Sequence, residues 1–177
     1  VRLKDLIPTL QTSIRYHTAD NFTGAPLPGY GVPDAWMLDV PAKALLRAQE
    51  SLAKQGLGLL IYDAYRPKRA TKGMVAWAER NQLMELFTNG YIARHSGHNH
   101  GHTVDLTLIE LATGKPLDMG TPWDTLDERS HTYKAKGEAL KNRLLLKKEM
   151  EAVGFRYYYK EWWHFGMKLE GSRSRDV

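Results

Sequence analysis

Runs of apolar residues with regular spacing divide the chain into predicted helices and predicted strand regions. The helices are marked by apolar side chains at three- and four-residue spacing, and Gly56 and Gly154 follow two of them as natural stops. The predicted helices span about 41–56, 68–87 and 136–154. The strand regions are short and apolar, cleanly alternating, or rich in aromatic residues. The predicted strand regions span about 57–65, 103–111 and 155–170.

The order of these elements predicts the fold class. Helices and strands do not alternate in a regular strand–helix–strand series, so we expect an α+β fold with a mainly antiparallel sheet flanked by helices. The 177 residues fit a single domain, 1–177, with no linker or repeat. Turn-forming residues are frequent in residues 1–34, which predicts an irregular N-terminal arm. Residues 171–177 are expected to form a loose, flexible tail.

Composition narrows the possible classes of protein and of site. Hydrophobic residues make up 42% and charged residues 25%, which is typical of a globular domain. No apolar run approaches the ~20 residues that a membrane helix needs. The chain contains no cysteine, so disulfides and thiolate zinc sites are excluded, and any metal must be held by His, Asp or Glu.

Charge and the first residue bear on partners and location. The net charge of +5 is not gathered into a dense Lys/Arg cluster, so a nucleic-acid partner is not expected. The chain begins at Val1, which either a cleaved signal peptide or trimming would explain. Periplasmic, secreted and cytoplasmic locations therefore all stay open, as does the oligomeric state.

The stretch "SGHNHGHTVD", residues 96–105, contains the first candidate metal ligands. Its histidines at every second position suggest a row of three ligands, but the aspartate suggests a different choice. Asp105 lies in a predicted strand whose other face is apolar, where a carboxylate is disfavoured and needs a partner. A loop through Gly101 can fold back so that His98 and Asp105 converge on one ion. A solvent-facing aspartate at a sheet edge is the simpler alternative.

The stretch "EWWHF", residues 161–165, supplies a second candidate pair. Glu161 and His164 are three residues apart in an aromatic setting, where simple solvation is not expected. They could form an ion pair at a strand end, or act as a zinc ligand and a general base. Two ligands from residues 98–105 together with His164 would leave a position open for water, as catalytic zinc requires. Glu161 would then accept the proton of that water.

The stretch "YDAYRP", residues 62–67, follows a predicted strand and places Arg66 just beyond the strand end. Arg66 could simply pair with the Asp63 carboxylate. It could also donate to a carbonyl oxygen that becomes negative during attack. Both hold together if Asp63 orients the guanidinium.

Together these stretches resemble the zinc D-alanyl-D-alanine dipeptidases, the VanX-like family of vancomycin resistance. The family pattern S-x-H-x-x-G-x-A-x-D corresponds to residues 96–105, its E-x-W-H to residues 161–164, and its "DAYRP" is unchanged at residues 63–67. The similarity continues through "DLTL" (105–108) and "DMGTPWDTLDERSH" (118–131). It therefore covers most of the chain after about residue 30.

The resemblance implies a hedgehog/D,D-peptidase-like fold, Zn²⁺ as the cofactor and the small dipeptide D-alanyl-D-alanine as the substrate. The metal ligands that it implies are His98, Asp105 and His164. It implies that Glu161 is the general base and that Arg66 stabilises the tetrahedral intermediate. It also implies that Ser96 helps to bind the substrate's C-terminal carboxylate and that Asp124 faces its free ammonium. A cap or turn aspartate is the alternative for Asp124.

Three positions concern the detail of the match. Thr103 stands where the family pattern has alanine, so a methyl and a hydroxyl are added near the ligand strand, where they would change substrate fit without removing a ligand. His100 and His102 occupy positions that the pattern leaves free. We therefore expect them to be neighbouring or surface residues and not ligands.

Two other functions remain as alternatives. D,D-carboxypeptidases acting on longer peptidoglycan stem peptides share the His–Asp–His set, but they usually carry "SGYRS"-like sequence before the arginine and an arginine shortly after the last histidine. "DAYRP" and "HFGMK" here favour the dipeptidase. A non-catalytic zinc-binding module would not need Glu161 beside His164. The physiological role (resistance, wall recycling or nutrient use) is not determined by the sequence.

Overall fold

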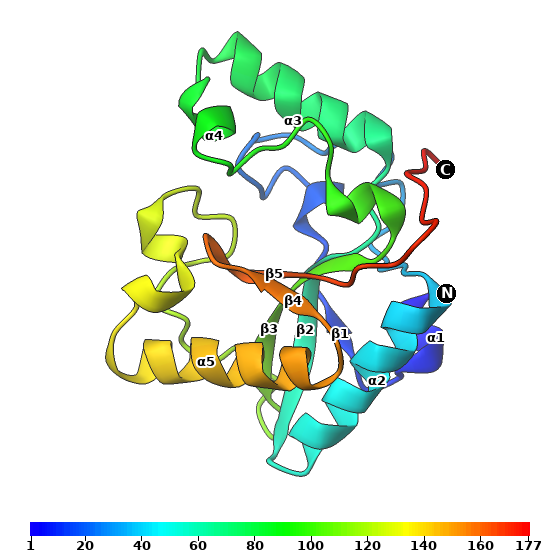
Figure 1. The fold of residues 1–177 in the computed structure, drawn as a ribbon, viewed down its shortest axis with the longest axis vertical. Helices are drawn as coiled ribbons and strands as arrows, with labels where there is room; N and C mark the ends of the chain where they lie inside the picture. The colour runs from blue at the N-terminus through cyan, green and yellow to red at the C-terminus, as the bar shows by residue number, and fades with distance from the viewer.

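A computed structural model describes all 177 residues and contains one five-stranded mixed sheet with helices packed against it (Figure 1). The strands, in sheet order, are β1 (Gln11–Thr12), β2 (Leu57–Asp63), β3 (Thr103–Glu110), β5 (Glu161–Gly166) and β4 (Arg156–Tyr158). The pair β1 and β2 is parallel, and the other three pairs are antiparallel. The prediction of an α+β fold with a mainly antiparallel sheet is therefore confirmed.

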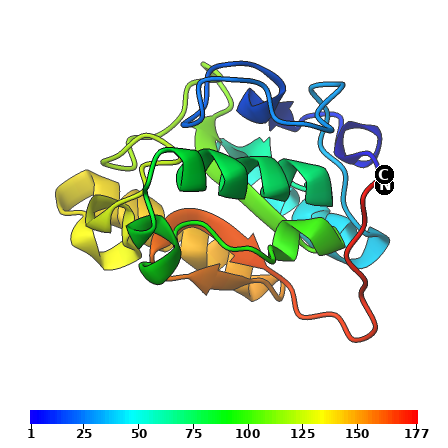
Figure 2. The ribbon, with the colours of Figure 1, turned by 90° about the horizontal axis from the view of Figure 1, so that it is seen from above.

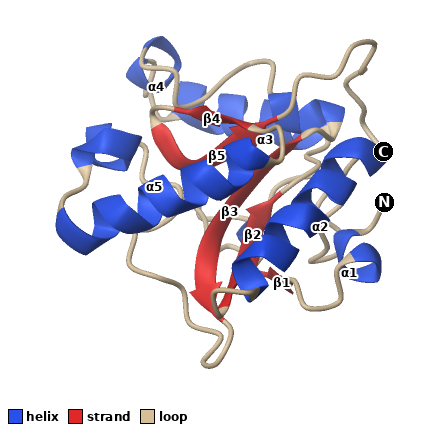
Figure 3. Ribbon diagram, turned by 60° about the horizontal axis from the view of Figure 1, so that its bottom comes forward, coloured by secondary structure: helices blue, strands red, loops and turns tan.

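The two longest helices, α2 (Asp39–Ala53) and α5 (Gly137–Ala152), pack against each other and against the strands (Figure 3). The remaining α-helices are α1 (Leu3–Leu6), α3 (Lys68–Arg80) and α4 (Glu85–Thr88). Four short 3-10 helices complete the chain: η1 (Arg15–His17), η2 (Gly97–His100), η3 (Glu128–Ser130) and η4 (Thr132–Lys134). None of the helices combines the length and the apolar character that crossing a bilayer requires.

Strand β3 is the central strand and is buried on both faces. Val104, Leu106 and Leu108 are fully buried in the main core, as the alternation of the sequence predicts. Each such side chain contributes roughly 1.5–3 kcal/mol by leaving water. Asp105 and Thr107 point to the opposite face, where they are also buried. The apolar face thus holds Asp105 in a rigid position.

The predicted helix over 68–87 is not continuous, so that prediction is wrong. Helix α3 ends at Arg80, and Gln82 has φ +58°, a left-handed conformation that no α-helix continues through. The Asn81 side chain donates to the carbonyl of Trp77 at 2.8 Å and so satisfies an acceptor of the last turn. The short helix α4 then begins at Glu85.

The two ends of the chain make backbone contacts with the rest of the domain. The N-terminal arm contains α1, and its strand β1 pairs with β2. The tail lies along the start of α3, where the backbone of Arg175 accepts a hydrogen bond from Lys68 at 3.2 Å and donates one to Asn99 at 2.8 Å. Both termini lie on the same side of the molecule (Figure 1 and Figure 2).

Candidate active site

The register of three neighbouring strands brings acidic and histidine side chains side by side. Asp105 of β3 lies opposite Asp63 of β2 on one side and opposite His164 of β5 on the other. Residues opposite each other in an antiparallel pair have Cβ atoms about 4.5–5.5 Å apart. Three polar residues that are distant in sequence therefore form one row across the sheet.

The 3-10 helix η2 adds His98 to this row. The Ser96 hydroxyl accepts a hydrogen bond from the backbone N–H of His98, and the Asn99 side-chain oxygen accepts one from the backbone N–H of Ser96. These reciprocal bonds form a capping box at the start of η2. Gly101 ends the turn with φ +75°, which allows the chain to reverse into β3. His98 is buried, and its Nδ1 donates to the carbonyl of Ala64 at 2.7 Å. Its Nε2 therefore presents a lone pair to the row.

Three atoms in this row form a nearly equilateral triangle. His98 Nε2 lies 3.3 Å from His164 Nδ1 and 3.2 Å from Asp105 Oδ1, and the last two atoms are 3.0 Å apart. A tetrahedral site with ligand bonds of about 2.0–2.1 Å has edges of about 3.3 Å. A single cation between the three atoms would satisfy a lone pair of each of them. The donor set and its geometry thus fit one divalent metal ion.

The ionisation of these groups suits metal binding. Burial lowers the pKa of His164, so its imidazole is neutral near pH 7. Burial opposes ionisation of Asp105, but the adjacent His98 and His164 hold the pKa of this carboxyl well below its usual range. A metal ion needs deprotonated carboxylate and neutral imidazole, and this site supplies both.

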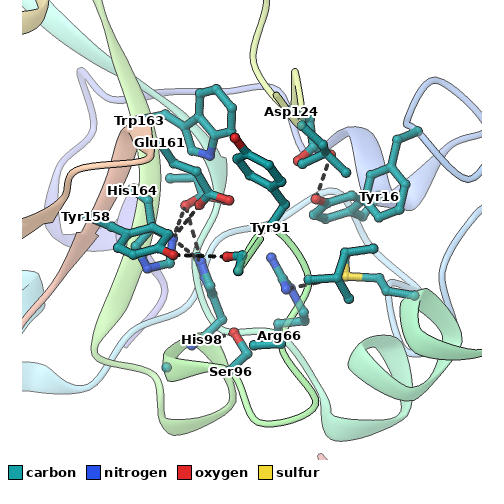
Figure 4. Close-up of a pocket in the computed structure, with 18 of the residues that line it drawn as sticks. Tyr16, Arg66, Tyr91, Ser96, His98, Asp124, Tyr158, Glu161, Trp163 and His164 are labelled. Carbon is teal, nitrogen blue, oxygen red and sulfur yellow. Dashed lines mark hydrogen bonds and ion pairs between the residues drawn. The ribbon is translucent and has the colours of Figure 1, made fainter. Parts of the chain in front are cut away.

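Glu161 begins β5 and points into the same space as the metal-binding triangle (Figure 4). Its Oε2 lies 3.5 Å from His164 Nδ1, and its side chain is buried. Burial, with the negative charges of Asp105 and Asp124 nearby, raises the pKa of Glu161 well above the ordinary value. A carboxylate in this environment accepts a proton readily, which is the property of a general base.

Arg66 is held by Asp63, as one of the two interpretations predicts, and it also lines the cavity, as the other requires. Its Nε and Nη2 donate to Asp63 Oδ2 at 2.9 and 2.8 Å. Asp63 also accepts from the hydroxyl of Tyr30 at 2.6 Å. The guanidinium faces the ring of Tyr16, 5.3 Å from its centre. These contacts hold the positively charged Arg66 side chain at the cavity wall.

A cavity of about 370 Å³ is lined by all seven residues that the sequence predicts for the site. They are Arg66, Ser96, His98, Asp105, Asp124, Glu161 and His164. Asp124 adopts φ +65° and accepts a hydrogen bond from the Tyr16 hydroxyl at 2.7 Å. Burial raises the pKa of Asp124 to about 7. A half-buried carboxyl facing a cavity favours a cationic ligand group.

Several residues of the cavity wall were not predicted. Tyr16 of the arm, Tyr91, His95 and Tyr158 all line the cavity. Tyr158 donates to the carbonyl of Gly90 at 3.1 Å, and so joins the segment after α4 to the β4–β5 hairpin. No local pattern in the sequence marks these residues, because they come from distant parts of the chain and meet at the cavity only through the fold.

The three positions of uncertain role in the motif lie outside the cavity. The rings of His100 and His102 lie 5.2 Å apart, centre to centre, at a tilt of 34°, and His100 Nδ1 contacts the carbonyl of Ser172 at 3.3 Å. The Thr103 side chain packs against Gly97, where an added Cβ would lie 2.5 Å from Thr103 Oγ1. Thr103 thus fills space beneath η2 and is not among the residues that line the cavity.

Comparison with known proteins adds to this geometry. Residues 1–175 match the family model of peptidase M15, described as D-Ala-D-Ala dipeptidase. A D-alanyl-D-alanine dipeptidase of Enterococcus faecalis is 40% identical, with 92% of this chain and 88% of the relative covered. Proteins of the same description from Streptomyces coelicolor and Escherichia coli are 37% and 35% identical; these comparisons cover 94% and 97% of this chain, and 90% and 86% of the relatives.

Proposed function

The chain belongs to the D-Ala-D-Ala dipeptidase family of M15 peptidases, and we propose that it hydrolyses free D-alanyl-D-alanine with the help of a bound zinc ion. The proposed ligands are His98, Asp105 and His164. One observation carries the proposal: the three donor atoms have the spacing of a tetrahedral zinc site, and a buried glutamate with a raised pKa adjoins them. The absence of cysteine excludes the thiolate alternatives.

In the proposed hydrolysis, the bound zinc and the side chains around the three ligands have separate roles. Zinc, when bound, would lower the pKa of a water molecule and polarise the carbonyl of the scissile amide. Glu161 accepts a proton from the attacking water and later donates it to the leaving amine. Arg66, oriented by Asp63, donates hydrogen bonds to the carbonyl oxygen as negative charge develops on it. The Arg66–Asp63 ion pair is buried, so little water screens the interaction of Arg66 with this developing charge.

The two ends of the substrate would be recognised by different groups, the ammonium by a carboxylate and the carboxylate by a hydroxyl. Asp124 binds the free ammonium, and the Ser96 hydroxyl donates to the carboxylate while its oxygen continues to accept from His98. A carboxylate at the ammonium position allows the enzyme to select by length, since a longer peptide carries an amide there instead of a charge. An amide cannot form the same charge-assisted hydrogen bond.

A panel of peptides tests this function on the zinc-loaded protein. The panel contains D-Ala-D-Ala, L-Ala-L-Ala, mixed-chirality dipeptides, dipeptides with larger side chains, and a pentapeptide ending in D-Ala-D-Ala. We expect the highest kcat/KM for D-Ala-D-Ala and little cleavage of the pentapeptide. A preference for the pentapeptide would instead indicate a D,D-carboxypeptidase. No cleavage of any D,D-dipeptide by the zinc-loaded protein would indicate a non-catalytic module.

A further inference from the structure

The segment that carries Asp124, residues 119–131, has little regular structure of its own. Only the 3-10 helix η3 lies within it, and in Figure 1 it is the yellow-green to yellow stretch beside the sheet. Asp124 has φ +65°, a left-handed conformation that aspartate adopts more readily than most residues, and its carboxylate is held from outside the segment by the Tyr16 hydroxyl, which donates to it at 2.7 Å. The position of its carboxylate therefore depends on contacts from outside the segment.

Arg143 of α5 contacts both ends of this segment. Its side chain is 1% exposed, and its Nε donates to the carbonyl of Met119 at 2.7 Å. Nη1 donates to the carbonyl of His131 at 2.7 Å, and Nη2 to that of Arg129 at 3.0 Å. One guanidinium thus joins the first residue of the segment to two of its last three. The other outside side chains that hydrogen-bond to the segment each make one such bond: Tyr16, Tyr91 and Trp162.

Arg143 forms no ion pair, so its burial points to a geometric role instead. Burying a cation is unfavourable, and all three partners of Arg143 are carbonyl oxygens rather than a carboxylate. Its guanidinium also lies 5.9 Å from the ring centre of Trp162. A planar fork of donors can reach three carbonyls in fixed directions, whereas a lysine ammonium cannot reproduce this arrangement. The contacts specify the separation of the two ends of the segment.

We propose that Arg143 is a positioning residue for recognition of the substrate's free amino group. By joining the ends of residues 119–131, it places the Asp124 carboxylate at the cavity wall. The inference rests on the proposed function, in which Asp124 binds the ammonium. The metal ligands and Glu161 lie on η2, β3 and β5, so loss of Arg143 affects substrate binding more than bond cleavage.

The variant Arg143→Met tests this role, with Lys147→Met as the matched control. Lys147 lies one turn further along α5 and contacts Glu151 and Tyr157 instead of the segment. The measurements are zinc content, kcat and KM for D-Ala-D-Ala, and inhibition constants of two phosphinate dipeptide analogues, one with a free amino group and one N-acetylated.

We expect Arg143→Met to raise KM and the inhibition constant of the free-amine analogue about tenfold, the effect of losing one charge-assisted hydrogen bond. The acetylated analogue should bind as it does to the unchanged protein, and zinc content should stay at one per chain. Arg143→Lys should give values between those of Arg143→Met and those of the unchanged protein. It replaces the methionine variant in the test if that variant does not fold. Lys147→Met should match the unchanged protein in every measurement.

The outcomes separate this inference from the proposed function. Arg143 variants that keep the full preference for the free amine, or that weaken both analogues equally, would overturn the positioning role alone. Asp124→Asn, measured alongside, should lose the same preference. If the unchanged protein does not distinguish the two analogues, the assignment of Asp124 fails, and the role of Arg143 fails with it.

Discussion

Replacing the half-buried Asp124 by asparagine should stabilise the protein at high pH while impairing substrate binding. Burial raises the pKa of this carboxyl from 3.8 to about 7. Between these two values the unfolded chain is ionised while the folded protein keeps the proton, so the free energy of unfolding falls as pH rises. Above about pH 7 both states are ionised, and the full penalty is present. Asparagine carries no charge and escapes this penalty.

The magnitude follows from the shift in pKa. A rise of about 3 units corresponds to a ceiling of about 4 kcal/mol, at ~1.36 kcal/mol per unit. Water in the cavity screens the carboxylate, so we expect roughly 1–2 kcal/mol. Few other effects interfere, because the asparagine carbonyl can still accept from Tyr16, and asparagine is among the residues that best tolerate a φ of +65°.

Urea unfolding of the two proteins, at several pH values from about 4.5 to about 8, measures this effect. The series should be run with zinc and with a chelator, because a bound cation favours the ionised carboxylate. The advantage of Asp124→Asn should grow with pH and level off above about 7. Asp127→Asn is the control, since Arg129 lowers the pKa of Asp127 and no gain at high pH is expected. An advantage that does not change with pH would refute the reasoning.

Three further predictions concern the metal, the base and the turn that carries a ligand. Glu161→Gln should lower kcat by about 10²–10⁴ and keep one zinc per chain, as steady-state kinetics with metal analysis would show; substantial turnover would exclude Glu161 as the base. His98→Ala should lose stoichiometric zinc in equilibrium dialysis, whereas His100→Ala should retain it, and equal losses would contradict the ligand assignment. Gly97→Ala should destabilise the protein by roughly 1–3 kcal/mol through its contact with Thr103, and adding Thr103→Ala should restore most of that stability in urea unfolding.

Local patterns in the sequence were sufficient for the fold class and for the longer helices and strands. The alternation over β3 places Asp105 on the face opposite Val104, Leu106 and Leu108, because a strand has a period of two residues. The prediction of one long helix over 68–87 is wrong, because the apolar periodicity continues past the left-handed Gln82, which separates α3 from α4.

The sequence by itself determined which residue types are present for chemistry: two motifs with His, Asp and Glu, an arginine after a strand, and no cysteine. Only the tertiary structure decided how they meet. Strand register, which depends on packing of the whole sheet, sets Asp105 beside His164. Tyr16 reaches Asp124 across 108 residues of chain, and Arg143 joins the ends of a segment with no periodicity. Such contacts join residues far apart in the chain, so no spacing within a local window encodes them.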